Sequence, residues 1–223
     1  CLMALARIKR EIAHLWRKLS GEKARARASA FAAFDARLAN LGPGKLAIDL
    51  GANVGVFTER MAKTGADVIA FEPDPHAAQL LSRRLSSYSN VRLIAAAAGA
   101  EAGSFQLYRH RDFDASPDRR TTSSSLIAGK RNVDTANSLT VEVIDFAAFL
   151  RELDRDVTLL KIDIEGAEVD LLERLLPDPI AARIDAIFVE THERMLPNLA
   201  SRTAALKTTA HGRAKPVINW DWL

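Results

Sequence analysis

The chain has 223 residues, of which 48% are hydrophobic and 26% are charged, and its formal net charge is +3. This composition is typical of a soluble globular protein with one large domain, or with one domain and a modest appendage. No run of residues approaches the ~18 consecutive apolar positions of a membrane-spanning helix, so that class is excluded. The single cysteine, Cys1, can form no internal disulfide, and no secretory leader pattern follows it, so we expect a cytoplasmic protein.

The N-terminal segment carries the positive charge and is expected to be helical. Residues 1–40 contain nine Lys or Arg and three acidic residues, a net charge of +6, so the remainder carries −3. Apolar residues at helical spacing predict an amphipathic helix over 2–19, and an Ala- and Arg-rich stretch predicts a second over 22–41. We therefore predict a basic helical extension at 1–41 that packs on the rest of the chain or joins two copies of it. A membrane-surface helix and a lid over the active site remain open.

After the breaker at 42–44, strands alternate with helices up to the C-terminus. Short apolar runs predict strands at 45–50, 67–72, 90–96, 139–144, 157–164, 186–190 and 216–222. Helical patterns are found at 54–63, 75–86, 145–152, 167–176 and 196–207. Unbroken apolar strands separated by helices predict an α/β fold for residues 42–223, with a doubly wound, mostly parallel sheet and helices on both faces.

The alternation of strands and helices is interrupted between residues 99 and 139. Residues 104–109 predict a short edge strand, and the polar, basic stretch 110–138 predicts a long loop, which in a compact domain is usually functional or mobile. Its arginines could recognise an acidic or phosphorylated substrate, and a solvated insertion is the alternative. These arginines are Arg109, Arg111, Arg119 and Arg120.

The stretch "DLGANVG", residues 49–55, predicts a tight turn between a strand and a helix. A P-loop is excluded because no Gly-Lys-Ser/Thr sequence follows Gly55. A dinucleotide fingerprint requires a glycine where this chain has Asn53, whose side chain would crowd a diphosphate. The spacing is instead Gly51-x-x-x-Gly55, preceded by Asp49.

An acidic residue beside this turn favours a ligand that carries positive charge and no phosphate. S-adenosylmethionine has both properties, with a cationic sulfonium and an ammonium group. Glu72 closes the next predicted strand, 21 residues after Gly51, where a carboxylate can accept hydrogen bonds from ribose hydroxyls. We therefore favour S-adenosylmethionine over NAD and over a turn without a ligand.

Five segments together resemble the FkbM family of S-adenosylmethionine-dependent methyltransferases, over residues 46–192. They are "AIDLGANVGVFT", "VIAFEPDP", "SSSL", "LLKIDIEGAEVDLL" and "FVETH". The resemblance implies the class I methyltransferase fold and transfer to an oxygen of a small metabolite, a sugar or a polyketide-like scaffold. It assigns Glu72 to the ribose of the cofactor and residues 95–98 to the border of its adenine. The residues that it assigns to the methionine end are Asp49, Gly51, Asn53 and Gly55.

The resemblance ends before the C-terminus, where the closing antiparallel pair of strands of this fold is abbreviated.

Two polar clusters at predicted strand ends are candidates for catalysis, because open α/β sheets bind ligands at the carboxyl ends of their strands. The first contains Asp163 and Glu165, and the second contains Glu190 and His192. His192 is either a general base or a surface histidine. Asp163, Glu190 and His192 could instead hold a divalent ion, but we expect no metal.

Two further charged residues nearby have structural interpretations. Lys161 is expected to lie near a neighbouring acid, and Glu168 is expected to be a carboxylate at a helix start.

The favoured activity is O-methylation of a hydroxyl on a glycan or natural product, with no nucleic-acid partner and a possible homo-oligomer through the N-terminal helices. N-methylation, including that of RNA, is a second possibility. A cofactor-binding scaffold without turnover is a third.

Overall fold

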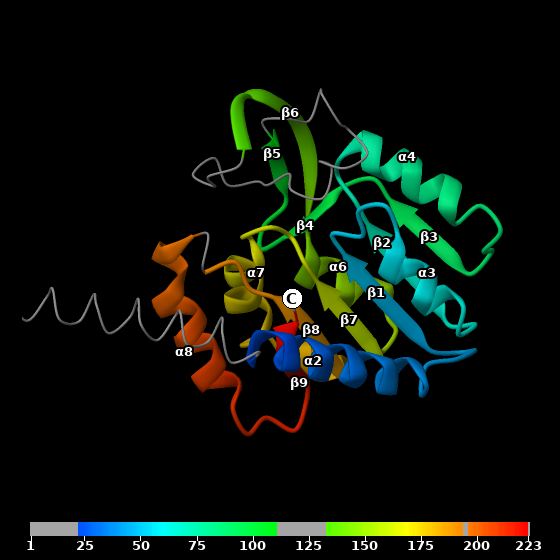
Figure 1. Ribbon diagram of the computed structural model, residues 1–223, viewed down its shortest axis with the longest axis vertical. Helices are drawn as coiled ribbons and strands as arrows, with labels where there is room; N and C mark the ends of the chain where they lie inside the picture. The colour runs from blue at the N-terminus through cyan, green and yellow to red at the C-terminus, as the bar shows by residue number, and fades with distance from the viewer. Residues whose placement is uncertain (1–21, 111–132, 194–195, 223) are drawn as a thin grey trace, which may run out of the picture.

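The computed structural model describes residues 22–110, 133–193 and 196–222. Its central sheet has six strands in the order β3-β2-β1-β7-β8-β9, and every pairing in it is parallel (Figure 1). The strands are β1 (Leu46–Leu50), β2 (Asp67–Phe71), β3 (Val91–Ile94), β7 (Leu159–Ile162), β8 (Ala186–Glu190) and β9 (Val217–Trp222). The strand order reverses between β1 and β7, so the predicted doubly wound α/β fold is confirmed.

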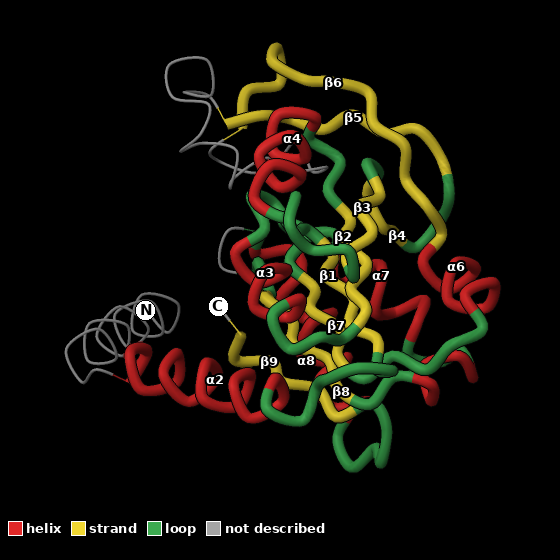
Figure 2. Tube along the Cα trace, turned by 90° about the vertical axis from the view of Figure 1, so that its right-hand side faces the viewer, coloured by secondary structure: helices red, strands yellow, loops and turns green. Residues whose placement is uncertain are grey.

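Helices cover both faces of this sheet because the side chains of each strand alternate between two apolar layers. One layer packs against α2 (Glu22–Leu38), α3 (Val56–Ala62) and α4 (Pro75–Arg84). The other packs against α6 (Phe146–Leu153), α7 (Glu168–Leu175) and α8 (Ala200–Ala210). Figure 2 shows α3 and α4 on one side of the strands, with α6 and α7 on the other. Two short 3₁₀ helices, η2 (Pro179–Arg183) and η3 (Pro197–Leu199), precede β8 and α8.

The described part of the N-terminal segment packs directly on the sheet. Phe34 of α2 is fully buried, and its ring contacts the rings of Phe57, Phe188 and Trp222. These aromatic contacts tie α2 to α3, β8 and β9. The helix expected at 2–19 lies outside the described residues. Within the described ranges, no helix is long and apolar enough to cross a membrane.

A second, three-stranded sheet stands beyond one end of the main sheet (Figure 1). Its order is β4-β6-β5, formed by β4 (Ala97–Gly99), β5 (Gly103–His110) and β6 (Val133–Asp145). The expectation of a loop over the whole of 110–138 was wrong, because β6 starts at Val133 and pairs antiparallel with β5. Cross-strand hydrogen bonding stabilises this polar stretch as a strand, although its composition is typical of a loop.

Most other elements agree with the sequence to within a few residues. α3 begins at Val56 rather than at residue 54, because Asn53 (φ 50°) and Gly55 (φ 83°) have left-handed backbone conformations that a helix cannot contain. At the other end of the chain, β9 pairs with β8 in parallel, and the described strands of the main sheet include no antiparallel closing pair.

Candidate functional site

A cavity of about 210 Å³ lies at the carboxyl ends of β1, β2 and β7, beside the point where the strand order reverses. The turn at 51–54 forms one wall, and Glu72 follows from the end of β2. Ala97 and Ala98 of β4 and Leu107 of β5 form an apolar wall. This is where doubly wound folds bind ligands.

The glycine-containing turn is held against the neighbouring strands by backbone contacts. The N–H groups of Gly51 and Ala52 donate to the carbonyl oxygen of Phe71, at 3.1 and 2.9 Å. Gly51 has a φ of 76°, and a Cβ at this position would overlap the carbonyl oxygen of Asp163. Glycine is therefore required here because β1 and β7 approach each other closely.

Glu72 presents a buried carboxylate to the cavity. One oxygen accepts a hydrogen bond from the N–H of Asn53 and the other from the N–H of Asp74, both at 2.8 Å. Burial raises the pKa of Glu72 to about 7 although both backbone donors favour the ionised form. Additional donors from a ligand would therefore stabilise the carboxylate.

Asp49 lies beneath the turn and is not among the residues that line the cavity. It is fully buried; one carboxylate oxygen accepts a hydrogen bond from Thr58 at 2.7 Å, and the other lies 3.1 Å from the ammonium of Lys161. The alternation of β1 points this side chain toward α3 rather than toward the ligand space. Gly55, the residue before α3, is also absent from the cavity wall.

Lys161 connects the turn to the end of β7. Its Nζ also lies 3.3 Å from the carbonyl oxygen of Gly51 and 3.6 Å from a carboxylate oxygen of Asp163. Burial by itself would lower the pKa of Lys161, but Asp49 and Asp163 outweigh it and raise the pKa. The expectation that Lys161 lies near an acid is confirmed.

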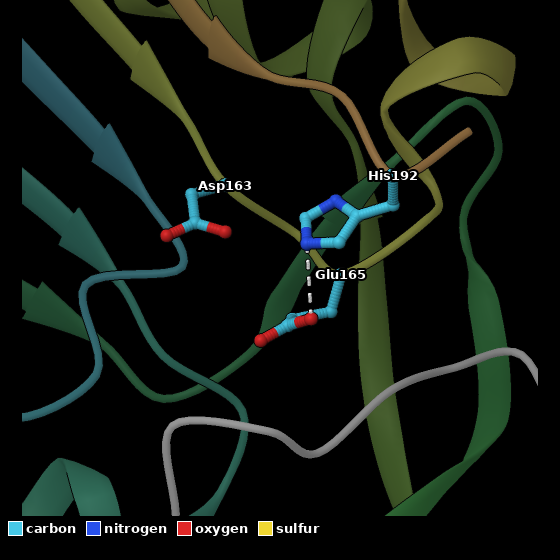
Figure 3. Close-up of side chains that lie close together, drawn as sticks. All are labelled: Asp163, Glu165 and His192. Atoms are coloured by element: carbon cyan, nitrogen blue, oxygen red, sulfur yellow. Dashed lines mark ion pairs between the residues drawn. The ribbon is translucent and has the colours of Figure 1, made fainter. Parts of the chain in front are cut away.

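Three of the four predicted catalytic residues, Asp163, Glu165 and His192, lie together beyond the ends of β7 and β8 (Figure 3). Nε2 of His192 is 3.1 Å from a carboxylate oxygen of Glu165 and 4.0 Å from one of Glu190. Asp163 and Glu165 line the cavity, whereas His192 lies behind them with 4% of its surface exposed. The alternative of a surface histidine was therefore wrong.

Glu168, at the start of α7, contacts both the backbone that follows β7 and the ring of His192. Its fully buried carboxylate accepts hydrogen bonds from the N–H groups of Ile164 and Gly166, at 3.0 Å. The same carboxylate lies 2.9 Å from Nδ1 of His192, although this ring N–H is not aligned for a hydrogen bond. The helix-start position was expected, but the contact with His192 was missed because it depends on how the ends of β7 and β8 meet.

The crowding of charges shifts the pKa values of the cluster. Burial raises the pKa of Asp163 to about 6, and burial together with the charge of Asp163 raises the pKa of Glu190 to about 8. Burial alone would lower the pKa of His192, but Glu165 and Glu168 raise it to about 10. These raised pKa values favour the protonated forms of His192 and Glu190 near neutral pH, whereas Asp163 is mostly ionised there and can accept a proton in the ligand-free site.

The predicted substrate-binding arginines are only partly described. Arg109 lies in β5, where its guanidinium contacts the buried carboxylate of Asp74 at 3.0 Å, next to the start of α4. This contact joins the second sheet to the main domain. Arg111, Arg119 and Arg120 lie outside the described residues.

The sequence profile of the methyltransferase FkbM domain matches residues 49–210, which include the turn, Glu72 and the whole acidic cluster. The chain belongs to the FkbM methyltransferase family. Membership implies S-adenosylmethionine as the methyl donor.

Individual relatives match parts of this FkbM-family chain. Methyltransferase sdnD of Sordaria araneosa is 28% identical over 161 residues, covering 61% of this chain and 62% of that protein. Ribosomal RNA small subunit methyltransferase A of Thermotoga neapolitana is 49% identical over 55 residues, or 25% of this chain and 21% of that protein. The chain thus spans about a fifth of one relative and less than two thirds of the other. A crystal structure of an rRNA methylase from Streptococcus thermophilus is 12% identical with a TM-score of 0.42, covering 79% of this chain and 75% of that one.

The described cavity suits this cofactor chemically. Glu72 offers a carboxylate for hydroxyl groups, and the apolar wall of Ala97, Ala98 and Leu107 suits a flat base. The only cation among the described lining residues is Lys161, whose charge is already balanced by Asp49 and Asp163. A cofactor with hydroxyls, positive charge and no phosphate fits such a lining better than a dinucleotide does.

Proposed function

We propose that the chain transfers a methyl group from S-adenosylmethionine to a hydroxyl oxygen of a small molecule or glycan. The observation that carries this proposal is the pair of carboxylates, Asp163 and Glu165, that line the cofactor cavity at the ends of the central strands. An alcohol is a weak nucleophile until its proton is removed, and a positioned base contributes about 10²–10⁴-fold to such a reaction.

The cofactor-binding assignments follow from the cavity wall. Glu72 would accept hydrogen bonds from the ribose hydroxyls, and Ala97 and Ala98 would pack beside the adenine. The backbone of the turn, including Gly51 and Asn53, would face the methionine end. Asp49 and Gly55 would act indirectly, by holding the turn and the start of α3.

The chain's own residues would align the acceptor and remove its proton. When bound, S-adenosylmethionine supplies a methyl group on a cationic sulfur, so that the O–C bond forms as the C–S bond breaks. The carboxylates of Asp163 and Glu165, which line the cavity, can accept the hydroxyl proton and pass it to solvent. Protonated His192 would orient Glu165 through their 3.1 Å contact.

The electrostatics of the described site favour a neutral or cationic acceptor over a polynucleotide. Two carboxylates, Asp163 and Glu165, line the cavity, and the charge of the described lining cation, Lys161, is already balanced by Asp49 and Asp163. Such a surface repels phosphates, whereas proteins that bind nucleic acids gain affinity by neutralising them. RNA must nevertheless be included among the acceptors that are tested, because one relative is named for ribosomal RNA.

Calorimetric titration followed by a methyl-transfer assay tests this proposal. We expect S-adenosylmethionine and S-adenosylhomocysteine to bind, NAD not to bind, and methyl groups to appear on sugars or hydroxylated metabolites but not on RNA. Transfer to RNA alone would replace the acceptor class that we propose. Tight cofactor binding without transfer to any acceptor would favour a scaffold role instead.

A further inference from the structure

Three side chains of types that bind metal ions converge beside the cavity. Carboxylate oxygens of Asp163 and Glu165 and a ring nitrogen of His192 all lie within 4.8 Å of one another. They follow the ends of two adjacent parallel strands, β7 and β8, and Figure 3 shows the Glu165 carboxylate against the imidazole, with the Asp163 carboxylate beside them. One imidazole and two carboxylates form a mixed N/O donor set that suits a divalent cation.

The surroundings of the two ring nitrogens of His192 resemble those of a metal-binding histidine. His192 is 4% exposed, and its Nε2 faces Glu165, on the side of the cavity. The opposite nitrogen, Nδ1, is buried without an aligned hydrogen bond and lies 2.9 Å from the carboxylate of Glu168. Ligating histidines commonly place their second nitrogen against a carboxylate, which fixes the orientation of the ring.

The charge balance also favours a cation at this point. Around His192, the carboxylates of Glu165, Glu168 and Glu190 lie 3.1, 2.9 and 4.0 Å from its ring nitrogens. Asp163 adds a fourth carboxylate, and Lys161, 3.6 Å from it, lies closer to Asp49, at 3.1 Å. With His192 neutral as a ligand, a divalent ion would offset the negative charges of Asp163 and Glu165.

We propose that Asp163, Glu165 and His192 bind a divalent cation such as Mn²⁺ that holds the acceptor of methyl transfer. When the ion binds, Nε2 of His192 releases its proton to solvent and coordinates the ion through its lone pair. The inference rests on the proposed function. Three protein ligands leave open positions in an octahedral shell, so the acceptor class is a compound with two neighbouring oxygens, such as a vicinal diol. The cation would lower the pKa of the acceptor hydroxyl, whose proton passes to solvent.

The cation site is tested without methyl transfer by titrating Mn²⁺ into chelator-treated full-length protein and measuring free Mn²⁺ by electron paramagnetic resonance. We expect one site, weakened at least tenfold by Glu165→Gln and by His192→Asn. Glu142→Gln removes an exposed carboxylate outside the cluster and should leave the affinity unchanged. Calorimetric titration of S-adenosylmethionine into each variant, at unchanged melting temperature, establishes that the fold and the cofactor cavity are intact.

The outcomes separate this inference from the proposed function. Absence of a Mn²⁺ site, or equal affinity in wild type and Glu165→Gln, overturns the inference. Full methyl transfer by the chelator-treated protein also overturns it and leaves the proposed function standing. A Mn²⁺ site that needs Glu165 and His192, in a protein that methylates no hydroxyl, supports the site and contradicts the function.

Discussion

Asp49 and Lys161 face each other directly across the pairing of β1 with β7, and their carboxylate and ammonium groups are 3.1 Å apart in a fully buried layer. The same ammonium reaches the carbonyl oxygen of Gly51. The pair therefore joins the strand that precedes the glycine-containing turn to the strand that precedes the acidic cluster. Buried charges of this kind depend on each other, because either one alone would be poorly solvated.

Replacing Lys161 with Met should destabilise the protein strongly. The substitution leaves Asp49 as a buried charge without its partner, for which the expected cost is about 3–5 kcal/mol of unfolding free energy. Lys63→Met is the matched control, since Lys63 is 60% exposed and pairs with Glu59 at a helix surface, where solvent screens the pair and little loss of stability is expected. Urea unfolding measures both. Equal costs in the two variants would contradict the structural role of Lys161.

The double variant Asp49→Asn/Lys161→Met tests why Lys161→Met is destabilising. The cause is either that Asp49 loses its ionic partner or that the lysine side chain itself is lost. Removing both charges leaves no buried ion without a partner, so it should be less destabilised than Lys161→Met alone. A double variant as unstable as the sum of the two single variants would show that the residues act independently.

Gly51→Ala should be much more harmful than Gly44→Ala. Both glycines have positive φ values, 76° and 81°, so alanine costs about 1–2 kcal/mol at either position for backbone conformation. A Cβ at Gly51 also overlaps the carbonyl of Asp163, whereas one at Gly44 meets nothing within 4 Å. Thermal unfolding should therefore show a far larger drop for Gly51→Ala. Similar melting temperatures would mean that β1 and β7 can separate at little cost.

Glu72→Gln should weaken binding of S-adenosylmethionine by about ten- to a hundredfold. Hydrogen bonds to a charged group contribute about 1.5–3 kcal/mol, and the neutral amide loses that contribution while keeping the shape. Glu101→Gln changes an exposed acid away from the cavity and serves as the control. Isothermal titration calorimetry reports both affinities. Unchanged binding in Glu72→Gln would exclude Glu72 as a ribose ligand.

The affinity for S-adenosylmethionine should also fall as the pH drops below about 7. The pKa of Glu72 in the free protein is raised to about 7, and hydroxyl donors from the cofactor favour its ionised form. Below that pKa, Glu72 must lose its proton before it can accept the hydrogen bonds, so the dissociation constant rises by up to about tenfold for each unit by which the pH falls. Above that pKa, Glu72 is already ionised and adds no pH dependence to the affinity. Titrations between pH 5.5 and 8.5 test this, and Glu72→Gln should remove the Glu72 contribution to the slope.

Much of the fold could be predicted because its signals are local. β8 matches its predicted bounds, and α7 and β9 match theirs to within a residue at each end, because apolar runs and helical spacing directly reflect burial. The start of β6 could not be predicted from its polar composition, since that segment is held by pairing with β5. The position of Lys161 near an acid was predictable from strand alternation, but its partner Asp49 was not.

The sequence by itself determined the family, the turn at 49–55 and the positions of the acidic residues at strand ends. Each of these features is encoded by residues that are neighbours in the chain. Only the tertiary structure decided that Asp49 lies beneath the turn, that His192 is buried, and that Glu168 and Glu165 lie within 2.9 and 3.1 Å of its two ring nitrogens. These outcomes depend on strand register and on the meeting of loops from β7 and β8. Distance between residues far apart in the chain is set by packing, which no local pattern encodes.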